Sequence, residues 1–121
     1  MKKRIMYLGI FAALLVSALR MTAFAASSGH LDGGVSGLVY YATLKNTSGG
    51  SRYCSLYLYE SGYNDGSNLQ ELGADRGVIR NEYYASISKH ANLSYGFASG
   101  MVYKGTTAAS GVGATYHKRL R

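Results

Sequence analysis

Residue types that ligate metals or act as nucleophiles are scattered along this sequence. His30, His90 and His117 stand far apart, and the chain has one cysteine, Cys54. Zinc sites need several such ligands at short, regular spacing, so the pattern does not predict a zinc site. No G-x-S-x-G sequence marks a nucleophilic serine. These residues therefore favour neither metal nor nucleophilic chemistry.

Acidic residues offer two further possibilities. A catalytic pair could lie among Glu60, Glu71, Asp75 and Glu82, but the sequence alone does not bring any two of them to a working separation. The segment 64–68, NDGSN, has oxygen ligands and a glycine, yet it lacks the frame and the terminal glutamate of a calcium loop, so it predicts a turn. We therefore expect a protein that is not an enzyme, with no catalytic, cofactor-binding or metal-binding residues.

Tyrosines are the strongest candidates for a binding role. In the segment RYCSLYLYE, strand alternation places three tyrosines on the face opposite Cys54 and its leucines: Tyr53, Tyr57 and Tyr59. We expect Tyr41 to extend this row from a neighbouring strand. A buried row would be an aromatic ladder that stabilises a sheet, whereas an exposed row would be a flat platform for glycan rings or a protein partner. The sequence leaves both open.

The elements that position these residues are strands. The segment VSGLVYYATLKN alternates apolar and polar positions and ends in the turn-rich NTSGGS, and RYCSLYLYE ends in the turn-rich SGYNDGSN. Further strand-like segments are VIRNEYYASISKH, LSYGFASGMVYKG and ASGVGATYHKRL, while NLQELGADRG is ambiguous between a strand and a helical turn. The pattern predicts an all-β fold, a small antiparallel β-sandwich of five to seven strands or a small open barrel.

Two pentapeptides are nearly identical, SGLVY at 36–40 and SGMVY at 99–103. If both lie in strands of the same phase, Tyr40 and Tyr103 point inward. The two halves of the chain do not align beyond this stretch, and repeat arrays need three or more stacked units. We interpret the pair as two similar core strands without a functional site.

Residues 1–25 have the features of a secretory signal peptide. A cationic start, MKKR, precedes an apolar run of 15 residues at 5–19, shorter than the ~20 that a membrane-spanning helix needs. Ala23 and Ala25 have the spacing that signal peptidase recognises, which predicts cleavage before Ala26; an uncleaved short anchor is the alternative. We expect a helical signal peptide, a single β-rich domain at 26–121, and secretion, with membrane contact only through the signal peptide before cleavage.

Charge narrows the choice of partners. The mature chain would carry nine basic and six acidic residues, and three of the basic ones lie in the C-terminal HKRLR. No basic face with interleaved aromatics is visible, so we expect no specific nucleic-acid binding. We expect this basic end to be solvated, with contact to anionic polymers as the alternative. Cys54 shares its phase with Leu56, which favours a buried thiol over an intermolecular disulfide.

The chain resembles the small secreted bacteriocins of the lactococcin 972 type in its signal peptide, its Gly/Ser/Tyr-rich composition and its short β-rich mature part. It lacks their tryptophans and closing aromatic pattern, so no family is assigned. The sequence predicts a secreted bacterial surface-interaction or binding module with a tyrosine-rich face, for a cell-wall glycan or a protein. The alternatives are a bacteriocin-like or toxin-like antimicrobial protein and a self-assembling extracellular matrix component.

Overall fold

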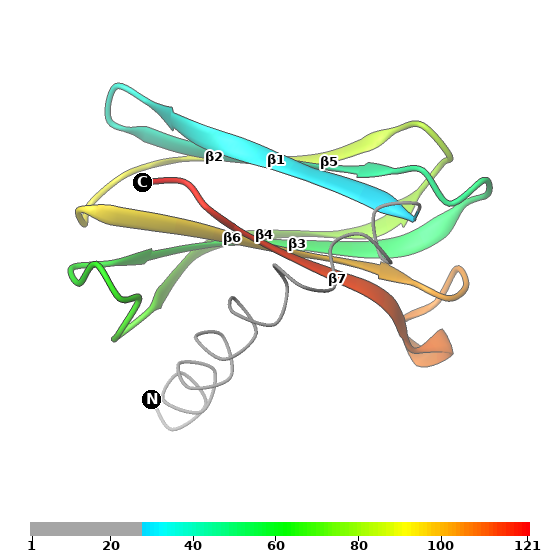
Figure 1. The fold of residues 1–121 in the computed structure, drawn as a ribbon. Helices are drawn as coiled ribbons and strands as arrows, with labels where there is room; N and C mark the ends of the chain where they lie inside the picture. Colours follow the sequence, from blue (N-terminus) through cyan, green and yellow to red (C-terminus); the bar gives the residue numbers. More distant parts are fainter. Residues whose placement is uncertain (1–27) are drawn as a thin grey trace.

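The structure is a computed structural model that describes residues 28–121. Its strands are β1 (Gly29–Ser36), β2 (Val39–Asn46), β3 (Arg52–Ser61), β4 (Gln70–Ile79), β5 (Tyr84–His90), β6 (Tyr95–Tyr103) and β7 (Val112–Arg119), with one 3-10 turn, η1 (Ala108–Ser110). They form two antiparallel sheets with strand orders β1-β2-β5 and β4-β3-β6-β7, packed face to face (Figure 1). The prediction of an all-β antiparallel sandwich is confirmed.

Two predictions about the leader fall beyond this range. The expected signal peptide at 1–25 and its cleavage site at Ala23, Ala25 and Ala26 lie outside the described residues. Within 28–121, no helix has the length and apolar character needed to cross a membrane.

Strand boundaries differ from the sequence interpretation in three places. β1 is a strand that the glycine-rich sequence GHLDGGVS did not predict, and it pairs with the whole of β2. The ambiguous NLQELGADRG contributes most of β4, which pairs along β3 from Arg52 to Glu60. The segment VIRNEYYASISKH divides at the turn 80–83 between β4 and β5. In each case pairing with a partner strand decides the conformation, and local propensity does not.

Large side chains of β2 face glycines of β6 across the core. Tyr40 and Leu44 are fully buried. A Cβ atom added to Gly96 would lie 2.8 Å from a ring carbon of Tyr40, and one added to Gly100 would lie 3.1 Å from a methyl of Leu44. The Tyr40 hydroxyl is satisfied because it donates to the Leu93 carbonyl at 2.7 Å. The two sheets can therefore approach this closely only because β6 has no side chain at these two positions.

The alternation predicted for β3 is present. Cys54, Leu56 and Leu58 are buried in the core, and the tyrosines of the same strand occupy the opposite face. Burial raises the pKa of the Cys54 thiol to about 11. The prediction of a buried Cys54 is confirmed.

The two similar pentapeptides have opposite orientations. Tyr40 points into the core, whereas Tyr103 lies on the outer side of its sheet, 4.9 Å from the ring of Tyr53. Val102, the neighbour of Tyr103, points into the core in its place, and Leu38 is exposed in the β1–β2 turn. The expectation that both tyrosines point inward is therefore wrong, because β2 and β6 enter the core with opposite phase.

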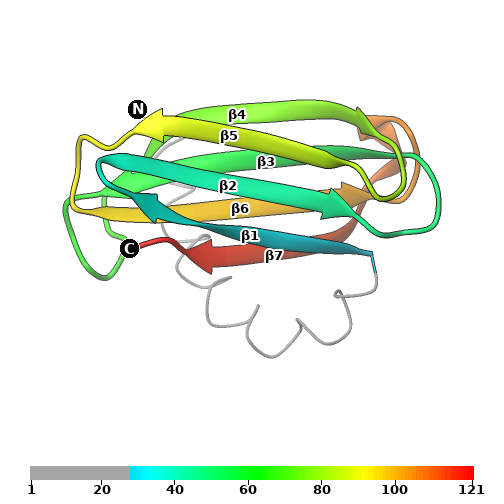
Figure 2. The ribbon, with the colours of Figure 1, turned by 90° about the horizontal axis from the view of Figure 1, so that it is seen from above.

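Charged side chains of edge strands reach across both open sides of the sandwich. Figure 2 shows these edge strands from above, with β4 beside β5 and β1 beside β7. On the side of β4 and β5, Asp75 accepts a hydrogen bond from the Ser86 amide at 3.3 Å. Lys89 of β5 lies so close to β4 that a Cβ on Gly73 would be 3.0 Å from its Cε. On the side of β7 and β1, Lys118 forms an ion pair of 3.0 Å with Asp32.

The basic C-terminus is packed against the sandwich. Arg119 donates to the Asn64 side chain at 2.8 Å and lies 4.9 Å from the centre of the Phe97 ring. Leu120 is buried, and the Arg121 guanidinium donates to the Ser94 carbonyl at 2.8 Å. Arg119 and Arg121 nevertheless remain exposed, so the basic end is held against neighbouring loops while its charged groups reach solvent.

Substitution of Gly96 tests the close approach of the sheets. Gly96→Ala should lower the free energy of unfolding by about 1–3 kcal/mol, because its methyl group would overlap the Tyr40 ring. Gly62→Ala is the control, since no atom lies within 4 Å of a Cβ there. Urea unfolding measures both variants, and equal midpoints would contradict this account of the core.

Candidate functional site

The two sheets differ in the chemistry of their outer sides. The side of the β1-β2-β5 sheet that faces away from the core is mostly polar and charged, with Asp32, Thr43, Lys45, Ser86, Ser88 and His90 among its residues. The outer side of the β4-β3-β6-β7 sheet carries a group of aromatic rings on its two central strands. We call these four residues the tyrosine face: Tyr53, Tyr57, Tyr59 and Tyr103.

The four rings are arranged as two pairs. Tyr57 and Tyr59 have ring centres 6.1 Å apart at an interplanar angle of 22°, and Tyr53 meets Tyr103 edge to face at 87°. The guanidinium carbon of Arg76 on β4 lies 5.9 Å from the centre of the Tyr57 ring. Each ring is partly buried. Packing against one another thus fixes the rings and still leaves part of each accessible.

Tyr41 does not join this face. β2 and β3 belong to different sheets, so the Tyr41 ring lies on the opposite outer side, where it covers Gly34. Its place beside the row on β3 is taken by Tyr103, which the sequence interpretation assigned to the core. Nothing in SGMVY itself indicates the outward orientation of Tyr103. Only the antiparallel pairing of β6 with RYCSLYLYE would have placed this residue on the same side as the tyrosines of β3.

Two polar residues lie among the rings. Ser55, between Tyr53 and Tyr57 on β3, is fully buried, and its hydroxyl has no hydrogen-bond partner among residues 28–121. His117 of β7 is opposite Ser99 of β6. Burial lowers the pKa of His117 to about 4, so its imidazole is neutral at pH 7. Arg76 is then the cation that contacts the tyrosine face.

The carboxylates considered as a catalytic pair are engaged separately. Glu60 is buried and accepts the backbone amides of Asn92 and Leu93, both at 2.9 Å. Glu82 forms an ion pair of 2.9 Å with Lys45, near the C-terminal end of β2. Within the part of the chain that the structure describes, no three His, Cys, Asp or Glu side chains are grouped to hold a metal ion.

The NDGSN segment forms the predicted turn. Asp65 accepts hydrogen bonds from the backbone amide of Ser67, at 2.9 Å, and from its hydroxyl. These bonds lower the pKa of the Asp65 carboxyl. Gly66 takes a positive φ of 78°, as a tight turn requires. The oxygen atoms of this segment are thus used to close a loop.

Comparison with known proteins finds a likeness in structure and none in sequence. No protein-family model matches the chain, and no curated protein sequence matches it. Among solved structures, the superoxide reductase from Nanoarchaeum equitans is similar, with a TM-score of 0.49 and 14% identity over 77% of this chain and 91% of that one. The prediction that the chain is not an enzyme is withdrawn. A likeness at this level assigns no activity to this chain.

The state of His117 predicts a pH-dependent stability. Burial holds its pKa near 4, below the ordinary value of 6.5, so between these values the unfolded chain binds a proton that the folded chain does not. The contribution of His117 to the free energy of unfolding should therefore be fully present above pH 6.5 and should decrease as the pH drops toward 4. The urea midpoint at several pH values measures this fall. His117→Gln should flatten the profile, and His90→Gln, at an exposed position, should not; identical profiles for the two variants would refute the assignment.

Proposed function

We propose that this chain is a binding module of a small secreted protein and that the tyrosine face engages its partner. The observation that carries the proposal is the contrast between the two outer sides: one is mostly polar and has single tyrosines such as Tyr41, and the other carries four packed rings. Tyrosine provides a large contact area at a low cost in side-chain entropy, and aromatic residues, Met and Arg are enriched at protein interfaces. Met101 and Arg76 adjoin the rings here.

The surroundings of the tyrosine face favour a protein partner over a cell-wall glycan. Tyr53 pairs across the sheet with Val78, and Tyr103 pairs with Val112. Both valines are exposed, at 55% and 41%. Together they extend the edge-to-face tyrosine pair into an apolar row across all four strands. The side chains of this row carry no polar group other than the two tyrosine hydroxyls, so the row suits an apolar protein surface better than a hydroxyl-rich sugar chain.

Tyr57→Ala tests the role of the tyrosine face. The variant should weaken binding to intact producer cells by about 1 kcal/mol or more, roughly fivefold, because Tyr57 lies near the centre of the face. Tyr41→Ala is the matched control, since it removes a tyrosine from the opposite outer side. Binding of labelled protein to cells, with circular dichroism as the check on folding, measures both.

Treatment of the cells before the assay separates the two kinds of partner. Protease treatment should abolish binding to cells if the partner is a protein, whereas binding to purified cell-wall glycan would show a sugar partner. Equal binding by Tyr57→Ala, Tyr41→Ala and the unchanged chain would leave the tyrosine face without a role.

A further inference from the structure

A second group of exposed rings lies at the β4–β5 turn and the first residue of β5. Tyr83 and Tyr84 are adjacent in the chain and are 59% and 57% exposed. Neither belongs to the tyrosine face, and the proposed function does not use them. Both rings are accessible to a ligand, and the contacts that hold the turn in place indicate what they can bind.

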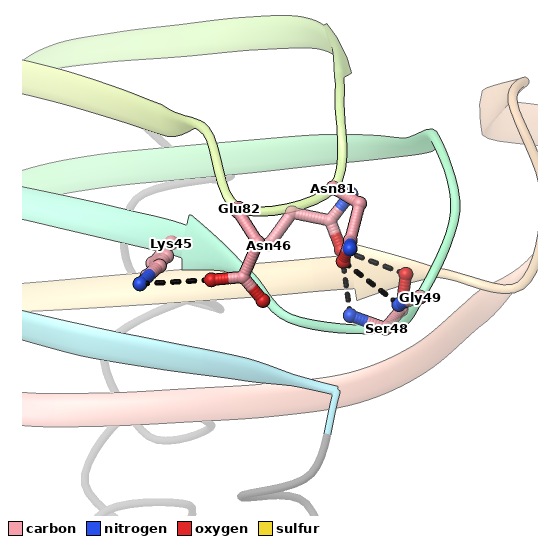
Figure 3. Close-up of polar contacts among 6 residues, drawn as sticks. All are labelled: Lys45, Asn46, Ser48, Gly49, Asn81 and Glu82. Atoms are coloured by element: carbon pink, nitrogen blue, oxygen red, sulfur yellow. Dashed lines mark hydrogen bonds and ion pairs between the residues drawn. The ribbon is translucent and has the colours of Figure 1, made fainter.

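Asn46, at the end of β2, fixes the β2–β3 loop, where Figure 3 shows it beside Ser48, and also the end of β4. It is fully buried, and its side-chain amide donates to the carbonyls of Gly50 and Ile79 at 2.9 and 2.8 Å. Its side-chain oxygen accepts the amide of Ser48 at 3.0 Å. One buried side chain thereby satisfies backbone groups from two segments that are distant in the sequence.

The backbone of Asn46 fixes the turn itself. Its carbonyl accepts the Glu82 amide at 2.6 Å, and its amide donates to the Tyr83 carbonyl at 3.0 Å. Asn81 accepts the amide of Gly49 at 2.9 Å, which ties the turn to the β2–β3 loop (Figure 3). Glu82 adopts a positive φ of 71°, and its carboxylate is held by Lys45. The turn is therefore rigid, which lowers the entropic cost of binding a ligand on its rings.

A cationic side chain lies near each of the two exposed rings. The Arg80 guanidinium lies 5.9 Å from the centre of the Tyr83 ring, and the Lys45 ammonium lies 5.7 Å from the centre of the Tyr84 ring. Lys45 is paired with Glu82, whereas Arg80 has no ion pair within residues 28–121. A guanidinium beside an aromatic ring can bind an acidic group with two parallel hydrogen bonds while the ring supports an apolar surface.

The loops at this end of the sandwich have an excess of positive charge. Four basic residues border them, Lys45, Arg52, Arg80 and Lys104, against one described carboxylate, Glu82. Residues 47–51 and 105–111 are Gly, Ser, Thr and Ala only. These neighbouring loops offer no large apolar side chain that would enter a lipid bilayer beside the tyrosines. The positive charge suits an anionic ligand, and the small side chains of these loops favour a soluble anionic polymer over a lipid surface.

We propose that Lys45, Arg80, Tyr83 and Tyr84 form a binding site, the turn site, for an acidic polysaccharide. A sugar ring stacks on Tyr83, and the acidic substituent of the polymer accepts hydrogen bonds from Arg80. Lys45 adds positive charge beside Tyr84. The site is separate from the tyrosine face, so the chain can hold an acidic polymer at its end while the face binds a protein.

Binding to immobilised dextran sulfate, with uncharged dextran as the reference, tests the turn site. The unchanged chain should bind dextran sulfate only, with an affinity that falls as salt rises. Arg80→Gln and Tyr83→Ala should each weaken binding about fivefold or more. Tyr83→Ala retains the net charge, so weaker binding by this variant would show that the ring itself contributes to the affinity. Lys89→Gln, which removes one positive charge near the other end of β5, should change the affinity less than twofold.

Several results would overturn the proposal. Equal losses in Arg80→Gln and Lys89→Gln, with none in Tyr83→Ala, would mean unspecific attraction to net positive charge. Binding to vesicles of anionic phospholipid without binding to dextran sulfate would identify a lipid surface instead. Tyr57→Ala should bind dextran sulfate normally, so failure of the turn site and failure of the tyrosine face are distinguishable. Thermal unfolding of each variant shows whether it is folded. The more conservative Tyr83→Phe keeps the ring and serves as a second check.

Discussion

The sandwich depends on the fit of Tyr40 and Leu44 against the bare backbone of Gly96 and Gly100. Leucines of both sheets, such as Leu31 and Leu56, complete the core around these two contacts between a large side chain and a glycine. The same contacts set the spacing of the sheets. That spacing determines which side chains are enclosed and which remain on the outer sides.

A consequence of this spacing is that β3 serves two purposes. Its inward side chains, such as Leu56, complete the core, and its outward side chains supply most of the tyrosine face. The face is therefore as rigid as the core behind it, because both belong to the same central strand. The turn site gains rigidity differently, from the hydrogen bonds of one buried asparagine.

Features that depend on neighbouring residues could be predicted from the sequence. The alternation in RYCSLYLYE indicated both the burial of Cys54 and the common side of Tyr53, Tyr57 and Tyr59, and NDGSN indicated its turn. These features arise from strand geometry and from Asx chemistry over a few residues.

Features that depend on distant parts of the chain could not be predicted. The exchange of Tyr41 for Tyr103 results from which strands share a sheet, and that is decided by packing between segments far apart in the sequence. In the sequence, Asn46 has the pattern of an ordinary turn residue, and nothing near it indicates that its side-chain amide donates to the Ile79 carbonyl. The C-terminal arginines likewise find acceptors only in loops that the fold brings close.

The charged side chains that cross the open sides of the sandwich limit how copies of this chain can associate. An incoming strand would have to displace Asp75 from the Ser86 amide on one side, or separate Lys118 from Asp32 on the other. Either step leaves a charged group beneath the new strand without its partner, which opposes strand addition. Strand addition is thus opposed at both open sides of the sandwich.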